Sequence, residues 1–148
     1  MPFDAPFQLG PFTIDPSGSL MPPIDSDASF SVRWRGCLVR AVMRPIHGVP
    51  RDGRVELELQ AMLGRVPSSA EAAAGAREGV LAMMRALGAG VRSGITASLS
   101  ADHRVMLEES RRVGPGLTIS VLLIELTGFV LDVAPYLDLA AEYGVIRP

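Results

Sequence analysis

The chain has 148 residues, of which 48% are hydrophobic and 20% charged, the composition of a globular domain with its own hydrophobic core. With 14 basic and 16 acidic residues the net charge is −2, which argues against nucleic acid as a partner, because binding to phosphate backbones normally needs a positive surface. We expect one domain over residues 1–148, in which 1–27 form a Pro-rich segment and 28–148 the core.

The numbers of cysteine and lysine residues limit the reaction types that the chain could catalyse and the cellular compartment that we expect. The single cysteine, Cys37, cannot form an internal disulfide, and the residues from Met1 to Asp4 lack the basic and apolar regions of a signal peptide. A reducing cytoplasm fits both features. All basic residues are Arg, so lysine Schiff-base chemistry and a phosphate loop ending in Gly-Lys-Ser/Thr are excluded.

The N-terminal half reads as strands. Residues 12–14 and 19–21 flank the turn-forming sequence Asp15-Pro16-Ser17-Gly18, which predicts a short hairpin at a sheet edge. Residues 30–43 and 54–66 predict two longer strands. In the register that we expect, Ala41 lies opposite Leu57 on the buried side and Arg40 opposite Glu58 on the wet side.

The first long strand changes phase along its length. Its apolar residues have even numbers at the beginning, as at Phe30 and Trp34, but odd numbers toward the end, as at Val39 and Met43. One extra residue in a strand exchanges its two faces, so this pattern predicts a bulge near Gly36.

A helix, a hairpin and a second helix follow. Ser68 and Glu71 have capping-box spacing, which predicts a helix that ends at Gly88 or Gly90, with Gly75 and Gly79 allowing a close approach of the sheet. Alternation over 95–99 and 104–108 predicts a hairpin with its turn at 101–103. After the connector 114–116, a helix is expected from Thr118 as N-cap toward Tyr143, with Gly144 as its stop and Pro135 as a kink or restart.

The last helix is apolar on two faces. One face carries Ile119, Leu122, Leu126, Phe129 and Val133, and the other Val121, Ile124, Gly128 and Leu131. A two-layer domain can bury only one of them internally, so we expect the second face to form a homodimer interface. A rival explanation is that the N-terminal segment from Phe3 to Ile24 covers it. A membrane span is not expected, because the run is short, contains Glu125 and lacks basic flanks.

Catalytic, cofactor and metal sites are not predicted. His47 and His103 fall in turn-like loops without a positioned serine, and no second His or Cys stands at ligand spacing from Asp102. Cys37 lies among apolar residues and is expected to be a small core residue rather than a nucleophile.

Two further polar groups favour surface positions. Glu108 and Glu109 point to opposite faces of one strand, so they cannot act as a carboxylate pair, and a solvated strand end is expected. Arg33 and Arg35 beside Trp34 could bind an acidic peptide, although a solvated strand face explains the same alternation.

The order of strands, a helix opened by Pro67-Ser68-Ser69-Ala70-Glu71, a hairpin and a C-terminal helix resembles the class I type III secretion chaperones over about residues 30–143. The order of the elements by itself predicts an α+β fold class, an antiparallel sheet with helices packed on one face. The resemblance implies small acidic bacterial homodimers that bind extended segments of secreted proteins. That family usually begins with an amphipathic helix, whereas this chain begins with a Pro-rich, strand-like segment.

Two classes of function remain open. The first is a non-catalytic, chaperone-like homodimer that binds a protein or peptide partner. The alternative is a small-molecule-binding or enzymatic domain whose site forms at the dimer interface. A hollow with converging polar groups would favour the second class, and an open apolar groove or edge strand the first.

Overall fold

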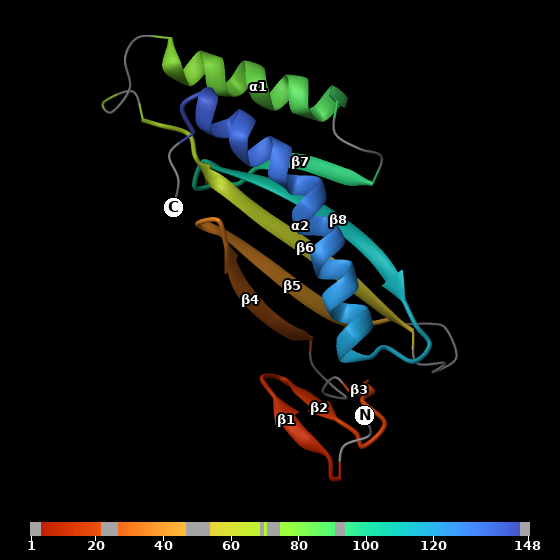
Figure 1. Cartoon of the computed structure of the whole chain (residues 1–148). Helices are drawn as coiled ribbons and strands as arrows, with labels where there is room; N and C mark the ends of the chain where they lie inside the picture. Colours follow the sequence, from red (N-terminus) through yellow and green to blue (C-terminus); the bar gives the residue numbers. More distant parts are fainter. Residues whose placement is uncertain are drawn as a thin grey trace.

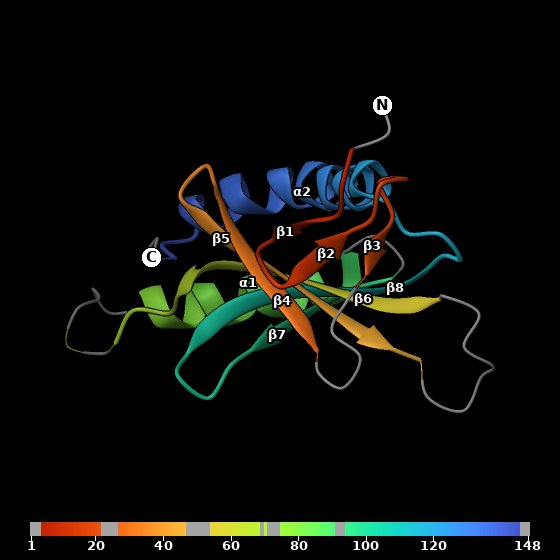
Figure 2. The same cartoon turned by 90° about the horizontal axis from the view of Figure 1, so that it is seen from below.

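Two antiparallel sheets and two helices make up the fold in a computed structural model of the protein, which describes residues 4–21, 27–46, 54–68, 70, 75–90 and 94–145 (Figure 1). The arrangement is α+β, as the sequence predicts. One helix crosses a face of the larger sheet and the other lies along an edge of it (Figures 1 and 2).

The larger sheet has five strands in the order β4-β5-β6-β8-β7, and all neighbours are antiparallel. Its strands are β4 (Ala28–Trp34), β5 (Cys37–Pro45), β6 (Val55–Arg65), β7 (Ile95–Leu99) and β8 (Arg104–Val113). Successive residues of a strand point to opposite faces, and apolar residues stand at every second position of these strands. Their side chains therefore gather on the inner face and form most of the core.

The faces of β5 and β6 agree with the sequence prediction, but the register does not. Ala41 pairs with Leu59, not with Leu57, and Arg40 pairs with Gln60, not with Glu58. The observed register is shifted by two residues. Such a shift keeps every side chain on its face, so the hydrophobic pattern alone does not distinguish the two registers.

The phase change at Gly36 is a hairpin turn rather than a bulge. Trp34 pairs with Cys37, so Arg35 and Gly36 form a two-residue turn, with φ of 51° and 78°. Left-handed φ values at both central residues match the twist of antiparallel strands, which explains a glycine at this point. The irregularity within the sheet lies in β6, where the register with β8 shifts between Met62 and Gly64.

The predicted N-terminal hairpin forms, but it belongs to a sheet of its own instead of the edge of the larger one. Its strands are β1 (Phe7–Leu9), β2 (Phe12–Ile14) and β3 (Leu20–Met21). Asp15 closes the turn, since its carboxylate accepts hydrogen bonds from the backbone N–H groups of Ser17 and Ser19. This small sheet lies by the first turn of the last helix and shares the main core through its buried side chains Phe12, Ile14 and Leu20 (Figure 1).

The first helix, α1 (Ala76–Gly90), lies along β7 at the sheet edge (Figure 1). Gly75 has φ of 90° and precedes the helix, and the predicted cap residue Glu71 lies outside the described residues. A Cβ atom at Gly79 would meet nothing within 4 Å, so the expected close approach of the sheet there is wrong. The helix instead packs through Val80, Met83 and Leu87, which are buried.

The second helix, α2 (Ile119–Glu142), covers the inner face of the larger sheet (Figures 1 and 2). Thr118 caps it by accepting a hydrogen bond from the N–H of Val121, and Gly144 follows its end with φ of 86°. The helix continues through Pro135 without a restart. Its sheet side is apolar, with Leu122, Phe129, Val133, Leu137 and Ala140 buried.

Candidate functional site

A charged cluster lies between β8 and α2, inside the apolar layer. The guanidinium of Arg111 donates to Glu109 Oε2 at 2.7 Å and to Glu125 Oε2 at 2.6 Å, and Asp132 Oδ2 lies 3.8 Å from it. The Glu109 side chain is 7% exposed and that of Arg111 19%. The hydrogen bond to Glu109 is the main cause that raises the pKa of Arg111, so its charge is permanent.

The expectation of a solvated strand end is therefore wrong for Glu109, although Glu108 and Glu109 do point to opposite faces. The signal was present in the sequence. Val105 and Leu107 fix the inward phase of β8, and Glu109 and Arg111 continue it. Charges at inward positions are rarely left unpaired, so partners on the covering helix were to be expected.

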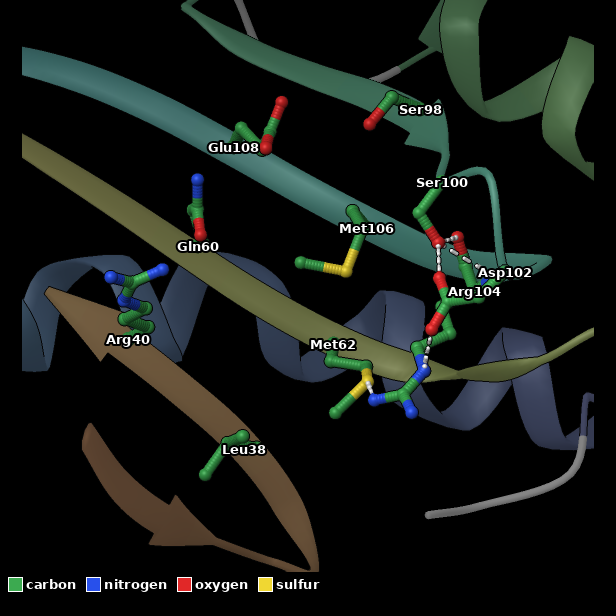
Figure 3. A pocket seen from close by; sticks show the side chains of 10 residues that line it. All are labelled: Leu38, Arg40, Gln60, Met62, Ser98, Ser100, Asp102, Arg104, Met106 and Glu108. Atoms are coloured by element: carbon green, nitrogen blue, oxygen red, sulfur yellow. Dashed lines mark hydrogen bonds and ion pairs between the residues drawn. The ribbon is translucent and has the colours of Figure 1, made fainter.

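The outer face of the sheet is hollowed, with a cavity of about 410 Å³ that faces away from α2 (Figure 3). Ten residues from β5, β6, β7, β8 and the turn between β7 and β8 line it: Leu38, Arg40, Gln60, Met62, Ser98, Ser100, Asp102, Arg104, Met106 and Glu108. The sequence predicted this face as polar and solvated, and it did not single out a hollow.

The two sides of this outer hollow differ in how their charges are paired (Figure 3). At the turn, Asp102 binds the hydroxyl of Ser100, which lowers the pKa of the carboxyl, and it forms an ion pair with Arg104. On the other side, the side chains of Arg40 and Glu108 have no hydrogen-bond or ion-pair partner among the described residues.

The outer face of α2 is exposed and apolar. Leu123 is 55%, Ile124 68% and Leu131 63% exposed. Of the four residues expected at a dimer interface, Ile124 and Leu131 lie on this face. Val121 is partly buried against the core, and Gly128 faces the sheet, where an added Cβ would lie 3.6 Å from the guanidinium of Arg111.

The N-terminal segment covers only the beginning of α2. Leu20 donates its N–H to the carbonyl of Leu117, and Ser19 bridges to Thr118. An apolar cavity of about 290 Å³ remains there, lined among others by Leu9 and Leu123. In the described residues the segment does not cover Ile124 or Leu131, so the rival explanation for the second apolar face is wrong on this point.

The structure separates the three residues of the predicted peptide-binding group. Arg33 is exposed on the outer face, whereas Trp34 packs partly buried against the core. Arg35 lies in the turn, with its Cζ atom 5.5 Å from the centroid of the Trp34 ring. Its guanidinium also forms an ion pair of 2.7 Å with Asp138 of α2. They do not form one surface, which leaves peptide binding by Arg33 together with Arg35 without geometric support.

Cys37 and His103 lie in the positions that the sequence predicts, the first in the core and the second in a turn. Cys37 is buried, and burial raises the pKa of its thiol, which disfavours the thiolate. His103 is exposed in the turn, with φ of 60°, and His47 lies outside the described residues. Within the described ranges, no three His, Cys, Asp or Glu side chains are arranged to hold a metal ion.

By length and composition α2 could cross a membrane, a property that the core helices of soluble proteins share.

No protein-family model, no curated protein and no solved structure matches this chain.

Proposed function

We propose that the protein is a non-catalytic, protein-binding module that works as a homodimer, with a second copy packed on the outer face of α2. The observation that carries this proposal is the exposure of Leu123, Ile124 and Leu131 on one side of the helix. Large apolar side chains that are exposed next to one another are typical of surfaces that contact another molecule.

The distribution of charge on α2 supports the same conclusion. A helix that covers a sheet normally presents charged residues to solvent. Here the two acidic residues of the first four turns, Glu125 and Asp132, lie within 4 Å of Arg111 on the sheet side. The exposed residues that remain between Ile119 and Val133 are uncharged: Ser120, Leu123, Ile124, Thr127 and Leu131.

The energetics suit a reversible dimer. Burying one large apolar side chain contributes about 1.5–3 kcal/mol, and a two-fold interface buries each of the three twice. Association costs roughly 4–15 kcal/mol in lost translational and rotational freedom. At the midpoints of these ranges the gain exceeds the cost by about 4 kcal/mol, so we expect a weak, reversible dimer that dissociates in the millimolar range.

A chaperone-like role in the cytoplasm is part of the same proposal. It rests on the order of the elements, in which strands, a helix, a hairpin and a helix follow one another as in the class I type III secretion chaperones. The N-terminal strands β1–β3 stand where those proteins usually have a helix. A bound client would therefore contact a different N-terminal surface.

The test is the Ile124→Asp substitution, followed by sedimentation velocity. A carboxylate at the centre of a desolvated interface is costly, so we expect the variant to dissociate at least tenfold more readily than the wild type. Leu99→Asp is the matched control, because Leu99 is an exposed apolar residue, 40% accessible, at the end of β7. We expect this control to dimerise like the wild type.

Two results would contradict the proposal. One is an Ile124→Asp variant that dimerises as tightly as the Leu99→Asp control. The other is a monomeric wild type that sediments with phospholipid vesicles, with the Ile124→Asp variant losing this binding. In that case the outer face of α2 contacts a membrane rather than a second copy.

A further inference from the structure

We propose that the outer hollow binds a short zwitterionic molecule with an apolar body, namely a free apolar amino acid or a dipeptide. Its carboxylate would contact Arg40 and its ammonium group Glu108 (Figure 3). The hollow faces away from α2, so this inference does not depend on the proposed dimer.

The two charges of the hollow that lack a described partner stand at the ends of a row across three strands. Arg40 pairs with Gln60 in the ladder of β5 and β6, and Gln60 pairs with Glu108 in that of β6 and β8. The three side chains therefore point to the same face. Arg40 and Glu108 stand two strand spacings apart, about 9–10 Å between their backbones, with Gln60 between them.

The two ends of this row carry opposite charges that a ligand could contact. Neither Arg40 nor Glu108 is engaged by another described side chain. The Gln60 amide nitrogen donates to Glu58 at 2.7 Å, and its amide oxygen accepts no hydrogen bond from another described residue, so it can act as an acceptor. An anion at Arg40, an ammonium group at Glu108 and a donor at Gln60 are the groups that a zwitterion supplies.

The neighbouring row is apolar. Leu38 pairs with Met62, and Met62 pairs with Met106, so the three side chains form the floor beside the charged row. Arg104 donates to the sulfur of Met62 at 3.2 Å and holds that side chain in place. Methionine side chains adapt to apolar groups of different shape, which favours a ligand with an aliphatic or aromatic body.

The size of the hollow agrees with a small ligand. Its volume of about 410 Å³ lies near the lower end of the range for small-molecule sites, which is roughly 300–1,000 Å³. An amino acid or a dipeptide fits this space. The long side chains of Arg40 and Glu108 can lean inward from either side to reach its two charged ends.

The experiment is a titration of the ¹⁵N-labelled full chain with the dipeptide Leu-Leu, followed by amide chemical shifts. We expect saturable shifts at β5, β6 and β8 residues around the hollow. The acetylated and amidated form of Leu-Leu has the same apolar body without charges, and it should bind at least tenfold more weakly. Titration with free leucine distinguishes an amino acid from a dipeptide as the tighter ligand.

Substitutions assign the two charges. Arg40→Gln and Glu108→Gln are each expected to weaken binding of Leu-Leu by about three- to tenfold, since each removes one partly solvated charge contact. Arg112→Gln, an exposed arginine of the same face outside the hollow, is the matched control and should leave the affinity unchanged. The Ile124→Asp variant should bind like the wild type, whatever its oligomeric state.

Three outcomes would overturn the inference. The first is the lack of saturable shifts with both Leu-Leu and free leucine. The second is equal binding of the charged and the blocked dipeptide. The third is a loss of affinity in Arg112→Gln as large as in Arg40→Gln, which would indicate nonspecific attraction to the face.

Discussion

At the scale of single residues, Arg111 connects acidic side chains of the larger sheet and of α2. Its guanidinium contacts Glu109 and Glu125 and lies 3.8 Å from Asp132 in the layer between β8 and α2. Removing its charge leaves Glu109, 7% exposed, without its 2.7 Å contact. Breaking a buried ion pair on one side typically costs about 3–5 kcal/mol.

Arg111→Met should therefore lower the free energy of unfolding by about 3 kcal/mol, measured by urea denaturation. Arg112→Met is the matched control, because Arg112 is the next residue of β8 and is exposed on the outer face. We expect it to change stability by less than about 0.5 kcal/mol. Equal effects of the two substitutions would mean that the cluster does not stabilise the packing of α2 on the sheet.

The residues of this cluster could be predicted only in part. The inward phase of Glu109 and Arg111 can be read from the alternation of β8. Their partners cannot, because Glu125 and Asp132 lie on another element and the angle at which α2 crosses the sheet is set by packing. The outer hollow is harder still, since it depends on the curvature of the sheet and on which side chains across three strands are left unpaired.

At the scale of elements, two glycines with opposite requirements test the local structure. Gly36 is the second residue of the β4–β5 turn and has φ of 78°, a conformation that costs an L-residue about 1–2 kcal/mol. Gly79 lies inside α1, where a Cβ atom would meet nothing within 4 Å. Alanine is preferred over glycine in a helix interior by roughly 0.5–1 kcal/mol.

Gly36→Ala should thus lower the melting temperature, and Gly79→Ala should raise it, in thermal unfolding followed by circular dichroism. The same chemical change is made at both sites, so each variant serves as the control for the other. A Gly36→Ala variant as stable as the wild type would contradict the turn conformation. Destabilisation by Gly79→Ala would show that another element does approach α1 at that point.

The elements themselves were largely predictable, because the hydrophobic periods of strands and helices differ. The phase change at Gly36 was found from that alternation, but a bulge and a two-residue turn both exchange the faces of the chain, and the turn was missed. The β5–β6 register failed for a related reason, since a shift by two residues preserves the pattern. The cap at Thr118 and the stop at Gly144 follow from local backbone chemistry and were predicted correctly.

At the scale of the whole molecule, the two faces of the larger sheet have separate roles in this account. The inner face packs against α2, whose outer side carries Leu123, Ile124 and Leu131. The outer face carries the hollow with Arg40 and Glu108. Because the sheet lies between the two surfaces, association through α2 and ligand binding in the hollow can be measured independently.

The proposed dimer requires that α2 presents its apolar side to a second copy of the chain. The most direct measurement is sedimentation equilibrium of the wild-type protein from about 10 μM to about 1 mM, since a surplus of about 4 kcal/mol over the cost of association holds a dimer near the upper concentration. We predict a mass that rises toward twice 15.7 kDa as the concentration increases. A mass that stays at 15.7 kDa up to about 1 mM, where even a dimer held by only about 4 kcal/mol would form, would contradict it.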